Sequence, residues 1–259
     1  MLSFILGLTA CGNKKRGEND IYIGTLAGPE SDLVKVAKDV AKEKYDLNIK
    51  IIEFEDYNTP NTALAEGTID ANMFQHQFYL DYVVAHKKYA IQSIGRTFIY
   101  PMGAYSKKYM TIGQLPDKAI IAIPNDPSNL ERALKLLADS DLISLTPSTN
   151  QEPLTLKNIS NNSKNFVFKE LDAAQLPRSL QDVDLAVINT NYAIPAGLKP
   201  KRDALLLESS KSPYANIVAV RTSEVDEPKY QQLMSALNSP EVLEKANELF
   251  EGQAIPAWR

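Results

Sequence analysis

The sequence predicts an α/β protein with two lobes and a ligand cleft between them. Short apolar runs that suit strands alternate with amphipathic segments that suit helices along most of the chain. The length of 259 residues is enough for about two domains of common size. Two consecutive helical segments close the sequence with no strand expected after them, so they should fold back over an earlier sheet. Ligand sites favour the cleft between such lobes.

The first part of the chain opens with a strand, a helix and a second strand. Apolar residues from Leu33 to Ala41 recur at helical spacing on one face, and the flanking strands are short apolar runs. Pro101 interrupts the last extended stretch, because proline cannot donate a hydrogen bond to a strand ladder. The elements expected here are strand 21–25, helix 30–44, strand 49–54, helix 62–66, strand 69–73, helix 78–88 and extended residues 93–105.

A second alternating set follows, and its first strand and helix carry the clearest local signal. Asp126 is placed to cap the helix, Pro127 suits the first helical position, and leucines recur at helical spacing after it. Residues 146–164 are polar and rich in loop-forming residues. The elements expected here are strand 119–123, helix 129–137, strand 166–170, a helix near 176–183 and strand 185–188.

The C-terminal part should return to the first lobe. Strand 217–221 precedes helices 228–238 and 240–250, each of which opens with proline. Two chain crossings are therefore expected, near 100–105 and near 212–216. The expected division is a leader and polar tether in 1–19, a first lobe in 20–104 that is completed by 213–259, and a second lobe in 105–212.

Charge and motif content exclude several classes of function. The net charge is −4 and the only block of basic residues is 14–16, so the sequence lacks the basic surface that nucleic-acid binding needs. His76 and His86 are the only histidines and lack metal-site spacing, and no Gly-x-Ser-x-Gly elbow occurs. The turn 24–28 lacks the glycine spacing and the Gly-Lys-Ser/Thr ending of a phosphate loop. We therefore expect no metal, no cofactor and no catalysis.

Cys11 is the only cysteine and ends a run typical of a lipobox. An apolar segment and small residues precede it, and the polar tether 12–20 follows. We expect Cys11 to carry lipid and to anchor the chain to a membrane, since the apolar run is too short to span one. The alternative is a buried cysteine in an N-terminal strand. No Lys or Arg precedes Leu2, so a start site further upstream is expected.

The start of helix 129–137 is a candidate anion site. Free N–H groups at a helix start, with the guanidinium of Arg132 one turn further in, suit a small carboxylate. The alternative is an arginine on a solvated helix face. Asn189 follows one apolar strand and Asn216 precedes another, where asparagine is often only a turn residue.

Aromatic residues complete a candidate binding site. Phe74, His76 and Tyr79 lie within six residues of one another, and Tyr57 lies in a loop. Aromatic residues usually belong to the core, but a core helix would not need the two glutamines that flank His76. Together with the guanidinium and the two amides from the other segments, this set suits a zwitterion with an apolar tail.

Six groups of residues carry a resemblance that runs in order from about residue 20 to the end. They are 56–57 (DY) with 60–64 (PNTAL), 70–72 (DAN) with 74–76 (FQH), 124–129 (PNDPSN) with Arg132, 171–180 (LDAAQLPRSL), 186–189 (AVIN) and 212–216 (SPYAN). In this combination the chain resembles the NlpA family of methionine-binding lipoproteins. The resemblance implies a type II periplasmic-binding-protein fold and the role of substrate-binding component in a methionine ABC transporter.

The resemblance also implies roles for single residues. Arg132 would bind the α-carboxylate, and Asn189 and Asn216 would hold the amino-acid head group, with Asn129 in the same site. The residues that would line the thioether pocket are Tyr57, Phe74, His76 and Tyr79. Glu131 departs from the small residue frequent in the family before the arginine, and it would weaken the carboxylate site if it reached Arg132.

The chain is therefore expected to capture L-methionine at the cell envelope, facing the periplasm or exterior, and to deliver it to an ABC transporter permease. It would be a lipid-anchored monomer without cofactor, metal or nucleic-acid partner. Two alternatives remain: a binding protein for a methionine-containing dipeptide, and a surface interaction lipoprotein that has lost transport. An enzyme that acts on amino-acid derivatives ranks third, because a nucleophile and metal ligands are missing.

Overall fold

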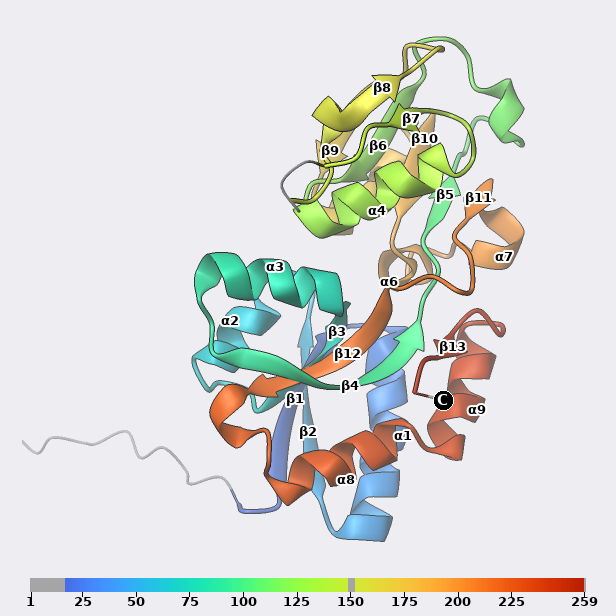
Figure 1. Ribbon diagram of the computed structural model, residues 1–259. Coiled ribbons are helices and arrows are strands. Elements are labelled where there is room, and N and C mark those ends of the chain that lie inside the picture. Colours follow the sequence, from blue (N-terminus) through green and yellow to red (C-terminus); the bar gives the residue numbers. More distant parts are fainter. Residues whose placement is uncertain (1–16, 149–151, 259) are drawn as a thin grey trace, which may run out of the picture.

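The computed structural model describes residues 17–148 and 152–258, so Cys11 and most of the expected leader lie outside the described residues. Strands and helices alternate along the chain, as expected of an α/β protein. They form two main β-sheets, each with helices packed on it, at opposite ends of the molecule (Figure 1). We call each sheet with its helices a lobe.

The first lobe contains a six-stranded sheet. Its elements are β1 (Asp20–Leu26), α1 (Pro29–Tyr45), β2 (Asn48–Phe54), α2 (Pro60–Ala65), β3 (Ala71–His76), α3 (Gln77–Lys87), β4 (Ile91–Ile99), β12 (Ala215–Arg221), η4 (Thr222–Glu224), α8 (Pro228–Leu237), α9 (Pro240–Leu249) and β13 (Ile255–Pro256). The strand order is β13-β4-β12-β3-β1-β2. Strand β1 pairs in parallel with β2 and β3, whereas β12 is antiparallel to β3 and β4. The carboxyl ends of β1, β2 and β3 therefore lie at one edge of the sheet.

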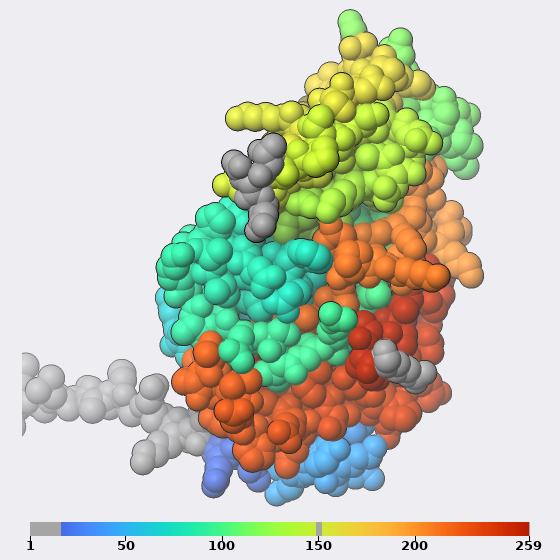
Figure 2. Space-filling model, in the orientation of Figure 1, coloured from blue at the N-terminus to red at the C-terminus, as the bar shows by residue number. Residues whose placement is uncertain are grey.

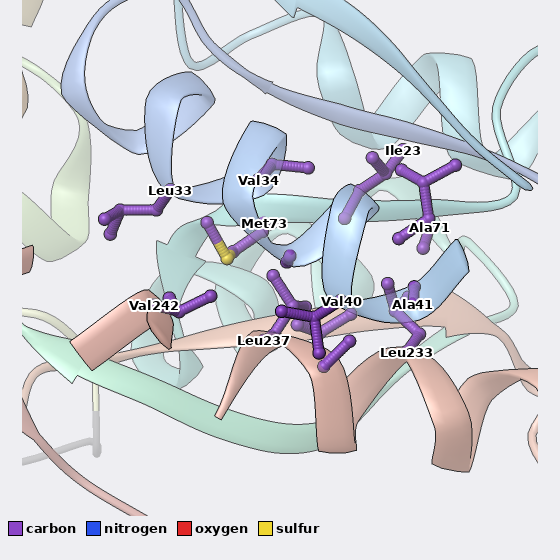
Figure 3. Close-up of a cluster of buried hydrophobic side chains, with 14 of the residues drawn as sticks. Ile23, Leu33, Val34, Val40, Ala41, Ala71, Met73, Leu233, Leu237 and Val242 are labelled. Carbon is purple, nitrogen blue, oxygen red and sulfur yellow. The ribbon is translucent and has the colours of Figure 1, made fainter. Parts of the chain in front are cut away.

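Helix α1 connects the sheet to the C-terminal helices. Its apolar face, which includes Val40 and Ala41, packs against Leu233 and Leu237 of α8 (Figure 3). Complete burial of a leucine side chain stabilises the folded state by about 1.5–3 kcal/mol. The two C-terminal helices thus return to the first lobe, as the sequence predicts.

The last strand differs from the prediction. Strand β13 follows α9 and pairs antiparallel with β4, where Ile255 lies opposite Ile99 and Pro256 opposite Phe98. The expectation that no strand follows the C-terminal helices was wrong. A strand of two residues, one of them proline, is too short to leave an alternating pattern in the sequence.

The second lobe contains a five-stranded sheet and a separate two-stranded one. Its elements are β5 (Gly103–Tyr105), η1 (Ile112–Gln114), β6 (Ile120–Pro124), α4 (Pro127–Ala138), β7 (Ser144–Leu145), η2 (Leu156–Asn158), β8 (Ile159–Asn161), β9 (Val167–Leu171), η3 (Ala173–Gln175), α5 (Leu176–Ser179), β10 (Leu185–Ile188), α6 (Thr190–Ala193), α7 (Pro200–Asp203) and β11 (Leu206–Leu207). The main sheet has the order β11-β5-β10-β6-β9, and β7 pairs with β8. Strands β6, β9 and β10 run parallel, so their carboxyl ends also share one edge.

The chain crosses between the lobes twice. It leaves the first sheet after Ile99 and enters the second at Gly103, and it returns between Leu207 and Ala215. Because β5 pairs with β10 and β11, residues 103–104 belong to the second sheet and not to the first. The lobes also touch along α3 and α4 (Figure 2).

Candidate ligand-binding site

A narrow cavity of about 20 Å³ lies between the two lobes. Most of its lining residues are aromatic or carry an amide. They are Tyr57, Phe74, Gln75, His76, Tyr79, Tyr100, Asn129, Arg132, Asn189, Thr190, Asn191 and Asn216. This lining contains all eight residues that the sequence nominates for ligand binding, and their contact with a ligand stays a prediction.

Strand ends position several of these side chains. Phe74 and His76 lie at the carboxyl end of β3, and Asn189 comes directly after β10. Asn216, near the start of β12, lies opposite His76 in the antiparallel register. Crevices at the carboxyl ends of strands are the usual ligand sites of open α/β sheets. The topology therefore brings residues that are far apart in the sequence to one place.

The first turn of α4 fixes the amide of Asn129. Asp126 caps the helix by accepting hydrogen bonds from the backbone N–H of Asn129 at 2.9 Å and from its Nδ2 at 3.0 Å. The Oδ1 atom of Asn129 accepts from Nδ2 of Asn189 at 2.8 Å and lies 3.3 Å from Nε2 of His76. These contacts form a hydrogen-bonded chain from the second lobe to the first.

His76 is neutral in this network. It caps α3, because its Nδ1 accepts the backbone N–H of Tyr79 at 3.2 Å. The ring proton consequently lies on Nε2, which donates to Asn129. Burial, with a smaller contribution from the positive charge of Arg132, lowers the pKa of His76 to about 3. The imidazole therefore acts as a fixed hydrogen-bond donor and not as a cation.

Arg132 is buried and not solvated, since only 4% of its surface is exposed. Its Nε donates to Glu208 at 3.0 Å, while Nη2 donates to Glu208 and to the carbonyl oxygen of Tyr100, the latter at 2.9 Å. The guanidinium carbon lies 4.6 Å from the centre of the Tyr214 ring. Across the described residues no hydrogen bond reaches Nη1, so this nitrogen is the one available to a ligand carboxylate.

Neither acidic neighbour of Arg132 could be assigned from the sequence. Glu208 pairs with the guanidinium across 76 positions of chain, and no motif marks it. Glu131 does not reach Arg132, because it forms an ion pair with Lys135 and accepts the backbone N–H of Leu154 at 3.1 Å. The departure from the family pattern at Glu131 therefore leaves the guanidinium undisturbed.

Three aromatic rings form the apolar end of the cavity. The ring centroids of Tyr57 and Phe74 lie 5.9 Å apart, those of Tyr57 and Tyr79 lie 6.0 Å apart, and those of Phe74 and Tyr79 lie 5.9 Å apart. The hydroxyl of Tyr79 donates to the carbonyl oxygen of Tyr57 at 2.9 Å. All three residues are buried in one hydrophobic cluster, so they belong to the core and to the cavity wall together.

Two buried polar atoms in the cavity wall have no hydrogen-bond partner in the described parts of the chain. They are Oδ1 of Asn189 and the hydroxyl oxygen of Tyr100. An unsatisfied buried polar group costs about 1–3 kcal/mol, so a ligand that supplies a donor would recover this energy. The cavity thus offers a guanidinium N–H and an amide oxygen, which suit the two charges of a zwitterion.

A buried carboxylate beneath the cavity was not nominated from the sequence. Glu30, in the first turn of α1, accepts hydrogen bonds from Nδ2 of Asn216 and Nδ2 of Asn191, each at 2.8 Å. Burial raises the pKa of Glu30 to about 8, although the bond from Asn216 acts in the opposite direction. An acidic residue in the first turn of a helix is common, so no local pattern distinguishes Glu30.

Other functional features are absent from the part of the chain that the structure describes. No group of three or more His, Cys, Asp and Glu side chains there is arranged to hold a metal ion. None of the helices within 17–148 and 152–258 has the length and apolar character needed to cross a membrane.

Comparison with known proteins shows the family of this chain. The family model of the NlpA lipoprotein matches residues 21–258. The chain is 42% identical to the D-methionine-binding lipoprotein MetQ of Escherichia coli (strain K12), and the match covers 98% of this chain and 94% of that protein.

Two solved structures show the same fold. A periplasmic substrate-binding protein of an ABC transporter from Coxiella burnetii is 55% identical, with a TM-score of 0.89 and coverage of 92% of this chain and 100% of that one. A nutrient binding protein from Burkholderia cenocepacia bound to methionine is 50% identical, with a TM-score of 0.89 and coverage of 92% and 99%. These similarities confirm the expected periplasmic-binding-protein fold, and the chain belongs to the NlpA lipoprotein family.

Proposed function

We propose that this chain is the substrate-binding component of an ABC importer and that its ligand is methionine. The observation that carries the proposal is that the cavity has a polar end and an apolar end. A guanidinium N–H of Arg132 and the unpaired Oδ1 of Asn189 lie in its polar wall, and three aromatic rings form its apolar wall. The relatives named for methionine support this choice of ligand.

Each part of methionine has a matching group in the cavity. Nη1 of Arg132 would bind the α-carboxylate, and Oδ1 of Asn189 would accept a hydrogen bond from the α-ammonium group. The thioether would contact the rings of Tyr57, Phe74 and Tyr79, since a polarizable sulfur gains from contact with aromatic rings. Recognition of this kind needs no chemical step, so the proposed protein is a receptor and not an enzyme.

The proposed receptor would work outside the cytoplasm, as a monomer tethered by lipid at Cys11, and would deliver its ligand to a membrane permease. The Coxiella burnetii relative is named as a periplasmic ABC transporter component, which supports this location. The relative from Escherichia coli is named for D-methionine, whereas the sequence-based expectation is L-methionine. Both enantiomers therefore belong in the test of the ligand.

A ligand panel tests the proposed function by thermal unfolding. The protein is first stripped of co-purified ligand by unfolding and refolding. We expect L-methionine to give the largest rise in melting temperature, by several degrees, because a thousandfold excess over Kd stabilises the folded state by about 4 kcal/mol. Norleucine keeps the shape but lacks the sulfur, so its shift should be smaller.

The other panel members separate the alternatives. If D-methionine gave the largest rise in melting temperature, the preferred enantiomer would change and the proposal would stand. If a methionine-containing dipeptide gave the largest rise, the dipeptide-binding alternative would be favoured. Glutamine and histidine are negative controls, because burial of a polar side chain among three aromatic rings costs more free energy than burial of a thioether. Failure of every ligand to shift the melting temperature would favour a surface interaction protein.

Replacement of Cys11 by serine tests the lipid anchor. We expect C11S to move from membrane fractions that require detergent into the soluble fraction, because stable attachment needs two or more acyl chains. The measurement is immunoblotting of fractions from cells that process lipoproteins. Thr9→Ser is the matched control, since it keeps both the cysteine and a small residue before it, and it should stay in the membrane fraction. Membrane retention of C11S would disprove the anchor.

A further inference from the structure

Glu30 is a buried carboxylate that makes none of the contacts proposed above for methionine. Only 2% of its surface is exposed. Among the described residues no Lys, Arg or His acts as a countercharge to Glu30, and burial is the main influence on its pKa. A charge buried without a countercharge is costly, and such groups concentrate at functional sites.

Two amides satisfy the oxygens of this carboxylate. Nδ2 of Asn216 donates to Oε1 of Glu30 and Nδ2 of Asn191 donates to Oε2, each at 2.8 Å. An amide whose nitrogen faces a carboxylate must turn its oxygen elsewhere. Both asparagines line the cavity, so Glu30 determines how their polar atoms face it.

The hydrogen bonds of Glu30 join the two lobes. Glu30 and Asn216 belong to the first lobe, in α1 and β12. Asn191 belongs to α6, which follows strand β10 of the second lobe in the chain. Both hydrogen bonds can therefore form together only when the lobes are closed on each other. Glu30 thus lies at the contact between the lobes, next to the end of the cavity that would hold the ligand's head group.

We propose that Glu30 is a positioning residue for the ligand's ammonium group: it orients the amides of Asn191 and Asn216 and supplies the negative charge that a bound ammonium balances. This inference rests on the proposed function. It adds to that function a countercharge for the ammonium group, which lies behind the residues of the cavity wall. Glu30 acts through the two amides and does not itself line the cavity.

The ionisation of Glu30 supports this role. Burial raises the pKa of its carboxyl group, and a nearby cation favours the charged form of a carboxyl group. An ammonium group held at the amide oxygens would be such a cation. The other titratable groups that the charge of Glu30 influences are the phenols of Tyr57 and Tyr100. Burial raises their pKa values well above the ordinary value, so both side chains stay neutral and neither is a countercharge to Glu30.

Two ligands that differ only in the amino group test the proposal. Calorimetric titration compares L-methionine with 4-(methylthio)butanoate, which keeps the carboxylate and the thioether and lacks the ammonium. In Glu30→Gln one of the two amides must lose its partner or turn over, since glutamine carries only one acceptor oxygen. We expect the affinity for methionine to fall on the order of 10- to 100-fold, and the affinity for 4-(methylthio)butanoate to change by less than about 3-fold.

A matched control separates this effect from a general effect of removing a carboxylate. Glu43→Gln makes the same change at an exposed position near the end of α1, and it should bind both ligands like the wild type. Equal losses for the two ligands in Glu30→Gln would show a merely structural role and overturn the proposal, as would unchanged affinities. Wild-type protein that binds neither ligand would overturn the proposed function itself.

A second variant keeps the test decisive if Glu30→Gln does not fold. Glu30→Asp retains the charge but is shorter by one methylene group, so it cannot reach both amides with the same geometry. Its loss of affinity should again be larger for methionine than for 4-(methylthio)butanoate, by a smaller factor than in the glutamine variant. Equal losses for the two ligands in this variant would also overturn the proposal.

Discussion

Replacement of Arg132 by alanine should weaken methionine binding by about 2–5 kcal/mol, which is on the order of a 30- to 5,000-fold rise in Kd. The reason is that the ligand carboxylate would remain buried without a partner. Arg132 is rigid before the ligand arrives, because Glu208, the carbonyl of Tyr100 and the ring of Tyr214 hold three sides of the guanidinium. Calorimetric titration of stripped protein measures the change.

Two further variants complete this experiment. Arg132→Lys should restore only part of the affinity, because an ammonium group cannot form the two-pronged contact with Glu208 and reach a ligand as well. Lys135→Ala removes an exposed cation from the same helix and should leave the affinity unchanged. Since Arg132→Ala also leaves Glu208 unpaired, the melting temperature of the unliganded variant must be measured beside the affinity. Near wild-type affinity of the folded alanine variant would contradict the assignment.

The stability of the unliganded protein should depend on pH through Glu30. Its pKa in the folded state is about 8, above the ordinary value of 4.5. The unfolded chain therefore releases this proton at lower pH than the folded protein does, and stability is lost as the pH rises from about 4.5 to about 8. A difference of this size corresponds to a loss of about 5 kcal/mol in the free energy of unfolding.

The measurement compares urea unfolding of wild type and Glu30→Gln across this pH range. Glutamine does not titrate, so the loss should appear only in the wild type. The lowered pKa of His76 acts in the other direction, since it makes the protein less stable as the pH falls below about 6.5. That contribution is common to both proteins and disappears from their difference. Parallel curves for the two proteins would show that Glu30 titrates normally in the folded state.

Local chemistry explains why much of the fold was predictable. The capping residue Asp126 and the proline after it mark the start of α4 in the sequence, and the structure has both where the pattern places them. Because strand ends meet at the edges of sheets, residues that follow apolar strands could be nominated together, as Asn189 was. The other nominated residues came from the start of a helix, from an aromatic cluster and from the family resemblance, and all eight line one cavity.

Contacts between distant parts of the chain explain what could not be predicted. Glu208 and Glu30 are single acidic residues whose importance comes from partners 76 and 186 positions away, and such pairings leave no local pattern. Long-range packing of the same kind decides which nitrogens of Arg132 bond to Glu208 and which nitrogen has no hydrogen bond within the described part of the chain. Sequence patterns therefore indicated which residue types surround the cavity but not which atoms remain available there.

The two outer strands of the larger sheet carry features that disfavour pairing with a strand of another copy. At one edge Pro256 of β13 has no backbone N–H, so it offers one hydrogen-bond donor fewer to an approaching strand. At the other edge β2 exposes charged side chains, including Lys50 and Glu53. Proline and charge on edge strands are the features by which natural sheets resist edge-to-edge aggregation. We therefore expect the short C-terminal strand to disfavour strand addition when many copies are crowded together.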